Sequence, residues 1–213
     1  MGPNRWDAVV FDYGRVLSHS PTRGEIAEFA ALVGVADPPF WQLYSDTRDD
    51  YDCGRQDCHG HWQRFADAAG IVLSADHIAR IVEYENRLWL RTNHDALALA
   101  REIKSQGVNT AILSNMPPDL LRELRNNFDW LDEFEVRIWS CEHGVIKLDS
   151  AIYRVCLDAL GCEPQRTLFF DDRPGNVEGA RRVGMDAHLF ESVEQAREIV
   201  RMGMQLPVAI IGH

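Results

Sequence analysis

Short apolar runs that end at a polar side chain recur along this chain, and they restrict its fold more than any other feature. The runs cover residues 8–11, 110–113, 167–170 and 187–190, with a more alternating run at 135–139. Each is too short for a helix, and the first three lack polar residues on alternate positions. Such runs are typical of parallel strands that helices cover on both faces. We therefore expect buried strands, with residues 135–139 nearer an edge of the sheet.

Amphipathic segments with helix end signals separate the expected strands. Residues 95–105 have helical periodicity, Pro117 and Pro118 open a second helix, Asp149 precedes a third that stops at Gly161, and Ser192 caps the last. Because strands and helices alternate, the expected fold class is α/β, with a doubly wound parallel sheet of the Rossmann type.

The stretch between residues 17 and 92 breaks this alternation, because it contains helical patterns and no confident strand. Successive apolar stripes with helical spacing begin there near Ile26, Phe40, Trp62 and Ile78. We therefore predict a helical cap over residues 17–92, inserted into an α/β core of residues 1–16 and 93–213. The crossings near residue 17 and residues 92–93 are the expected hinges.

Charge and hydropathy exclude several functions. The chain has 213 residues, with 22 Lys and Arg against 33 Asp and Glu, a formal net charge of −11. Such a surface repels nucleic acids and anionic membranes, so we expect neither as a partner. No apolar run is long enough to span a bilayer, and the first residues lack the pattern of a signal peptide. The 5 scattered cysteines then indicate reduced thiols and a cytoplasmic location.

Polar side chains that could carry chemistry stand where the expected strands end, or in the loop before the helix that precedes residues 167–170: Asp12, Ser114, Asn115, Lys147, Asp171 and Asp172. Each alone would be a cap, a turn or a surface residue. Together at the carboxyl edge of one sheet, the carboxylates repel one another unless a hard cation such as Mg²⁺ binds among them. A hydroxyl and an ammonium group beside that cation favour a phosphoryl group.

Motifs around these residues resemble those of the haloacid dehalogenase superfamily of hydrolases. The matching segments, in family order, are residues 11–17, 111–115, 144–149 and 169–184. They extend over essentially the whole chain. The resemblance also implies a helical cap after the first motif, where periodicity predicts one. The glycine two residues after the first aspartate resembles a subset of the superfamily that includes sugar-phosphate phosphatase-like members and some epoxide-hydrolase amino-terminal domains.

The resemblance implies a phosphatase mechanism and a small phosphorylated metabolite as partner. Asp12 would attack phosphorus and form an aspartyl-phosphate, and water would then release inorganic phosphate. The implied Mg²⁺ ligands are Asp12, the carbonyl of Gly14, Asp172 and, close by or through water, Asp171. The implied phosphate ligands are Ser114, the Asn115 backbone N–H and Lys147, while Asn176 would support the metal loop.

One position departs from the family pattern. Phosphatases of the superfamily usually carry an aspartate two residues after the nucleophile as general acid and base, and this chain has Gly14 there. A positioned acid/base contributes about 10²–10⁴-fold. Activity is therefore low, or the leaving group needs little protonation, or another residue serves. His19 is the nearest titratable candidate in the sequence, although an exposed loop position is the simpler interpretation of it.

Two alternatives to a phosphatase acting on a small phosphate monoester, with a sugar phosphate as one candidate, stay open. A 2-haloacid dehalogenase of the same fold uses an aspartate without metal, which the pair Asp171 and Asp172 disfavours. A protein that binds phosphate and metal without turnover is the alternative from another class, and Gly14 motivates it.

The cap is expected to select the substrate. The polar and aromatic side chains that it could offer are Trp41, Arg48, Arg55, His59, His61 and Trp62. Both tryptophans fall on apolar stripes, so we assign them to the cap's own core. We interpret the acidic run at 49–52 as a solvated turn. The apolar tail at 207–211 is expected to pack on the sheet and buries too little for a stable interface, so we expect a monomer or a weak homodimer.

Overall fold

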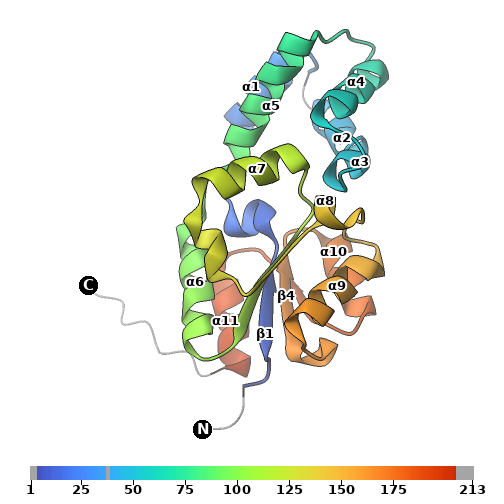
Figure 1. The fold of residues 1–213 in the computed structure, drawn as a ribbon. Helices are drawn as coiled ribbons and strands as arrows, with labels where there is room; N and C mark the ends of the chain where they lie inside the picture. Colours follow the sequence, from blue (N-terminus) through green and yellow to red (C-terminus); the bar gives the residue numbers. More distant parts are fainter. Residues whose placement is uncertain (1–3, 37–38, 205–213) are drawn as a thin grey trace, which may run out of the picture.

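A parallel sheet forms the centre of the core in the computed structural model, which describes residues 4–36 and 39–204. The 5 strands lie in the order β3-β2-β1-β4-β5, and every neighbouring pair is parallel (Figure 1). Their bounds are β1 Ala8–Phe11, β2 Asn109–Ser114, β3 Val136–Trp139, β4 Thr167–Asp171 and β5 Asp186–Leu189. The expected doubly wound α/β fold is confirmed, and β3 lies at an edge, as its mixed sequence predicted.

Helices cover both faces of the sheet, which explains why the strands are apolar without interruption. The first face packs on α6 (His94–Ser105), α7 (Pro118–Asn127) and α11 (Val193–Gly203), and the second on α9 (Ser150–Leu160) and α10 (Pro174–Arg182). Within β1, Phe11 belongs to the first of these apolar clusters and Val10 to the second. Side chains of a strand alternate between faces, so every residue of β1 finds an apolar partner layer.

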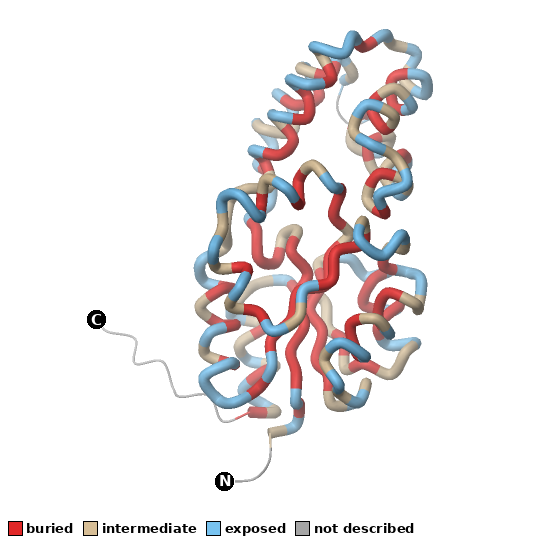
Figure 2. The backbone as a smooth tube through the Cα atoms, viewed as in Figure 1, coloured by how far each residue is buried: buried red, intermediate tan, exposed pale blue. Residues whose placement is uncertain are grey.

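In the described part of residues 18–92, which leaves out 37–38, five α-helices form a cap beyond the carboxyl ends of the strands (Figure 1). They are α1 Arg23–Val33, α2 Pro39–Asp46, α3 Asp49–Asp52, α4 Cys58–Ala69 and α5 Ala75–Trp89. These helices have an apolar cluster of their own, which includes Phe29, Phe40, Trp62 and Phe65. Figure 2 shows its buried residues facing one another between the cap helices. Trp62 is fully buried there, as its apolar stripe predicted.

The chain enters and leaves the cap at adjacent points. Ser18 and Thr92 form an antiparallel bridge, and the Asn93 N–H donates to the Leu17 carbonyl at 2.8 Å. The Asn93 side chain also donates to the Val16 carbonyl at 2.9 Å. The two connections therefore lie side by side, at the positions where the sequence places the hinges.

A second contact joins the cap to the core through α3, which packs on α8 (Ser140–His143) and reaches α7. The Ser140 hydroxyl donates to the Asp52 carbonyl, and the Tyr51 hydroxyl donates to Asp119 at 3.2 Å. Gly54 adopts φ +76°, and a Cβ there would lie 2.7 Å from the Cys141 carbonyl oxygen. Tyr51 is fully buried. The expectation of a solvated turn at 49–52 is therefore wrong, because this segment packs against the core.

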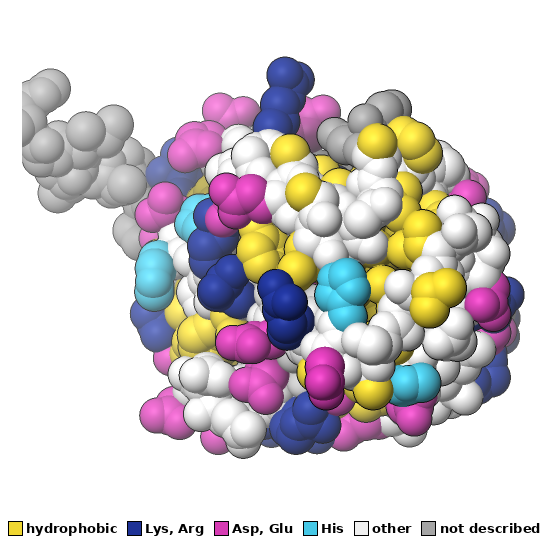
Figure 3. Space-filling model, turned by 90° about the horizontal axis from the view of Figure 1, so that it is seen from above, with side chains coloured by type: hydrophobic (Ala, Val, Ile, Leu, Met, Phe, Trp, Pro, Cys, Tyr) yellow, Lys and Arg dark blue, Asp and Glu magenta, His cyan; other side chains and the backbone are white. Residues whose placement is uncertain are grey.

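The distribution of surface charge and the character of the helices concern the expectation that neither nucleic acids nor membranes are partners. Seen from the cap side, acidic and basic side chains are interspersed (Figure 3). Among the residues described, no helix combines the length and the apolar character that crossing a bilayer requires. The tail at 207–211, expected to pack on the sheet, lies outside the described residues.

Candidate active site

Asp12 lies at the carboxyl end of β1, the central strand, where the connections that follow β1 and its neighbour β4 lead to helices on opposite faces of the sheet. Crevices at such points are the usual ligand sites of open α/β sheets. The Asp12 N–H donates to the Phe170 carbonyl at 2.9 Å, which extends the pairing with β4 by one residue. Its carboxylate accepts the Tyr13 N–H at 2.7 Å and is almost fully buried. The backbone therefore fixes both the position and the orientation of this carboxylate.

Lys147 bridges two of the candidate carboxylates. Its Nζ lies 2.7 Å from Asp12 Oδ1 and 2.6 Å from Asp171 Oδ2, and the side chain is buried. The Asn115 side chain holds the Lys147 backbone N–H at 2.7 Å. Burial lowers the pKa of Lys147, but the two carboxylates outweigh it and the net shift is upward, so the side chain stays charged.

The charge balance around Asp12 favours an additional cation. Burial raises the pKa of Asp12 to about 7, Asp171 and Asp172 act in the same direction, and Lys147 opposes them. Burial also raises the pKa of Asp172, with a further contribution from Asp171. A divalent cation beside these carboxylates would lower both pKa values.

The donor set fits a hard cation such as Mg²⁺. One oxygen each from Asp12, Asp171 and Asp172 lie within 4.8 Å of one another. In the part of the chain that the structure describes, Asp12 Oδ2 and Asp172 Oδ1 accept no hydrogen bond. Both oxygens are therefore free to bind a metal, and carboxylate oxygens are the ligands that Mg²⁺ prefers.

Asp171 differs from the other two carboxylates, although the sequence places it among the metal ligands. Its oxygens accept from the Arg173 N–H at 2.8 Å and from Asn176 Nδ2 at 3.0 and 3.1 Å, in addition to Lys147. The side chain is fully buried. With these acceptor sites occupied, Asp171 orients Lys147 and the loop that carries Asp172.

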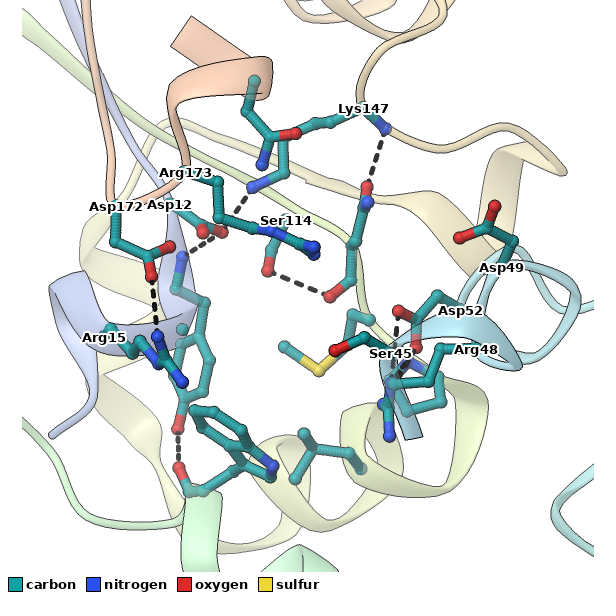
Figure 4. Close-up of a pocket in the computed structure, with 18 of the residues that line it drawn as sticks. Asp12, Arg15, Ser45, Arg48, Asp49, Asp52, Ser114, Lys147, Asp172 and Arg173 are labelled. Atoms are coloured by element: carbon teal, nitrogen blue, oxygen red, sulfur yellow. Dashed lines mark hydrogen bonds and ion pairs between the residues drawn. The ribbon is translucent and has the colours of Figure 1, made fainter. Parts of the chain in front are cut away.

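A cavity of about 220 Å³ separates this cluster from the cap. The sequence-predicted residues that line it are Asp12, Gly14, Ser114, Asn115, Lys147, Asp172 and Asn176. Asp171 lies behind them, and Figure 4 shows Asp12, Ser114 and Lys147 grouped on one side. His19 is not among the lining residues: it is exposed, and its N–H donates to the Arg91 carbonyl where the chain enters the cap. The structure therefore supports the exposed-loop interpretation of His19.

The cap contributes Arg48 to the opposite side of the cavity, next to Ser45, Asp49 and Asp52 (Figure 4). Arg48 Nη2 lies 2.8 Å from Asp52, and Nη1 pairs with Glu85 and the Tyr44 hydroxyl. These three partners restrain the guanidinium, and the carboxylates of Asp52 and Glu85 compensate its positive charge.

Of the other cap candidates, Trp41 lines the cavity, whereas Arg55, His59, His61 and Trp62 do not. The assignment of Trp41 to the cap core is thus only partly right, because it packs at the edge of that core and also faces the cavity. Its ring lies 5.8 Å from the guanidinium of Arg15, a contact that crosses from cap to core.

Sequence reasoning missed Arg15, Arg173 and Trp89, all of which line the cavity. Arg15 adopts φ +60°, a left-handed conformation that costs a non-glycine residue about 1–2 kcal/mol. Arg173 directly follows Asp172 and Arg15 stands three residues after Asp12, and this closeness to the aspartates of the last and first motifs is the signal that could have found them.

The doubly wound parallel sheet and the acidic, lysine-bridged crevice at its carboxyl edge define a hydrolase of the Rossmann-like α/β class. The chain belongs to the haloacid dehalogenase-like hydrolase family, whose model matches residues 7–184. The family resemblance inferred from the motifs is therefore confirmed.

Curated relatives match segments of the chain. It is 34% identical over 128 residues to bifunctional epoxide hydrolase 2 of Sus scrofa, covering 54% of this chain and 22% of that protein. It is 32% identical over 112 residues to the sesquiterpene phosphatase astK of Aspergillus oryzae, covering 52% of this chain and 57% of that protein. These matches span less than two thirds of either relative.

Solved structures support the fold. A HAD family enzyme of Bacteroides thetaiotaomicron, in complex with magnesium and inorganic phosphate, superposes with a TM-score of 0.68 at 18% identity. The match covers 86% of this chain and 93% of that one. At this identity the comparison establishes a shared fold.

Proposed function

We propose that this protein is a Mg²⁺-dependent phosphatase that hydrolyses a small phosphate monoester through an aspartyl-phosphate on Asp12. The observation that carries the proposal is the Asp12 carboxylate, which lines the cavity and has Lys147 Nζ 2.7 Å from its Oδ1. The phosphatase relative and the fold neighbour bound to magnesium and phosphate support it. A sugar phosphate remains one candidate substrate.

In this proposal Asp12, Asp172 and the Gly14 carbonyl hold Mg²⁺, with Asp171 behind them. The bound cation supplies charge neutralisation for the carboxylates and the phosphoryl oxygens. Asn176 keeps Asp171 in place through its two contacts, and Asp171 in turn fixes the Arg173 N–H and Lys147.

The chemical step uses residues around Asp12. One oxygen of its carboxylate forms a bond to phosphorus, while the other would stay on the metal, and the ester oxygen leaves with the bonding electron pair and takes a proton from solvent. Lys147, the Ser114 hydroxyl and the Asn115 N–H bind the phosphoryl oxygens as charge develops on them. Water then attacks phosphorus, the bond to Asp12 breaks, and inorganic phosphate leaves with the carboxylate regenerated.

The glycine at position 14 predicts how the rate of the proposed reaction depends on the leaving group. Its φ of −63° and ψ of 125° suit any residue, and a Cβ there would meet only Trp89, at 3.9 Å. The backbone therefore does not require glycine, and the position simply lacks an acid. Without a positioned proton donor, we expect the rate to depend steeply on leaving-group pKa, with aryl phosphates hydrolysed faster than alkyl phosphates.

The test is Mg²⁺-dependent phosphate release from a panel of aryl and alkyl phosphate esters. Asp12→Asn, which keeps the shape of the side chain, should abolish release, and Asp158→Asn, an exposed position on α9, should leave it unchanged. If wild type binds Mg²⁺ and phosphate but releases none from any ester, the protein is the non-catalytic binder. If it instead releases halide from a 2-haloacid without metal, it is a dehalogenase.

A further inference from the structure

Two arginines at the cavity remain without close carboxylate partners once the charges are paired. Lys147 lies between Asp12 and Asp171, and Arg48 between Asp52 and Glu85. Among the described residues that line the cavity, the cations that remain are Arg15 and Arg173.

Arg15 makes only a long contact with its nearest carboxylate. Its Nη1 lies 3.5 Å from Asp172 Oδ2, at the outer limit of a hydrogen bond. If Asp172 binds a metal, this contact competes with a divalent cation. The left-handed backbone of Arg15, whose N–H donates to the Ser18 hydroxyl at 3.3 Å, turns the side chain toward the cavity and under Trp41. A strained backbone that presents a charged side chain to a ligand site is a mark of function.

Arg173 is anchored at its backbone and free at its guanidinium. Its N–H donates to Asp171 at 2.8 Å, which fixes the base of the side chain. Within residues 4–36 and 39–204 the guanidinium forms no hydrogen bond or ion pair, and it lines the cavity. In Figure 4 the side chain extends from the Asp172 side toward Ser114, and Arg15 lies next to Asp172. The two guanidiniums thus approach the cavity from the same side, across from Asp49 and Asp52.

Building on the proposed phosphatase function, we propose that Arg15 and Arg173 form a subsite for a second anionic group of the substrate, either a carboxylate or a further phosphate. The phosphoryl group that is transferred has its own ligands in Lys147, Ser114 and Asn115. A guanidinium offers paired N–H donors that match the two oxygens of a carboxylate or phosphate. The substrate is then a phosphate ester whose leaving group carries an oxyanion.

Matched substrate pairs test the subsite. Glycerol 3-phosphate and 3-phosphoglycerate differ only in a hydroxymethyl group or a carboxylate at the far carbon. The monophosphate and bisphosphate of 1,3-propanediol differ in a second phosphate. We expect the anionic member of at least one pair to have a kcat/KM at least about tenfold higher in wild type, a difference of about 1.4 kcal/mol. The pair that shows the preference identifies the second group.

Variants connect this preference to the arginines. Arg15→Asn removes the guanidinium and suits the left-handed backbone, and Arg173→Gln removes the other charge. Each should lower the ratio of kcat/KM between the two members by about tenfold, whereas Arg154→Gln, at an exposed position on α9, should not change it. If wild type shows no preference in either pair, or if both variants weaken both members equally, the subsite is refuted. Equal losses would mean that the arginines bind the transferred phosphoryl group.

A binding measurement separates this inference from the proposed catalysis. Calorimetric titration of the Asp12→Asn variant with each probe in Mg²⁺ gives the same ratio as dissociation constants, without turnover. A tenfold preference in binding with no hydrolysis by wild type would retain the subsite and refute the phosphatase. Hydrolysis without any preference, in rate or in binding, would do the reverse.

Discussion

Substituting Gly54 by alanine should both destabilise the protein and weaken substrate binding. Its φ of +76° is left-handed, which costs an alanine about 1–2 kcal/mol. The added Cβ would also lie 2.7 Å from the Cys141 carbonyl oxygen and 3.3 Å from the Cys141 Cα, so one side of this contact must move. Overpacking of this kind costs a further 1–3 kcal/mol or so. We expect a total loss of about 2–5 kcal/mol in the free energy of unfolding.

Gly70→Ala is the matched control, because Gly70 is also a left-handed glycine of the cap, with φ +68° and nothing within 4 Å of its Cβ position. It should lose only the backbone contribution, about 1–2 kcal/mol. Denaturant unfolding of both variants gives the difference due to the contact between cap and core.

The same pair of variants links this contact to substrate binding. Arg48 and Asp52 line the cavity just before Gly54, so a shift of α3 away from α8 moves them. KM for an aryl phosphate should therefore rise severalfold in Gly54→Ala and stay unchanged in Gly70→Ala. Equal stability losses together with equal KM values would refute the role of this contact.

Three further predictions concern buried charges and the metal. Lys147→Met leaves Asp12 and Asp171 without their shared cation, so we expect kcat to fall roughly 10²–10³-fold and stability at neutral pH to fall by about 3–5 kcal/mol, measured by steady-state kinetics and urea unfolding. Burial, with help from Arg48, lowers the pKa of His61 to about 4, against about 6.5 in the unfolded chain. The stability it contributes is present above pH 6.5 and is lost as the pH falls toward 4, by about 3 kcal/mol in all; urea unfolding of His61→Phe should show a flatter slope over that interval. Removing divalent cations with a chelator should abolish phosphate release, and Mg²⁺ should restore it; full activity in the chelator would contradict the proposed donor set.

The sequence predicted the strands of the core well because they are apolar on both faces and end at polar side chains. The run at 8–11 matches β1, and Asp12 and Ser114 lie where parallel strands bring their ends together. The run at 187–190 was displaced by one residue, since β5 covers Asp186–Leu189. Phe190 follows β5 directly, and its apolar side chain packs in the first apolar cluster of the core. Its N–H donates to the Asp171 carbonyl.

What the sequence did not reveal depends on contacts between distant segments. In the sequence alone, the acidic run at 49–52 resembles a solvated turn. Its packing depends on the pairing of Arg48 with Glu85 and of Tyr51 with Asp119, which are distant in the sequence. Asp171 and Asp172 are adjacent and chemically identical, so only their hydrogen bonds distinguish the supporting carboxylate from the one that faces the cavity. No local pattern encodes either distinction.

The adjacent crossings at Ser18 and Thr92 have a consequence for how such a protein can change. Because the ends of the intervening segment meet, a shorter, longer or unrelated segment could replace it without stretching β1 or displacing Asp12. The core would keep Asp12 and the residues around it, while a graft between these two points supplied a different wall for the cavity. Exchange of this segment between relatives is therefore a practical way to redesign selectivity on an unaltered catalytic scaffold.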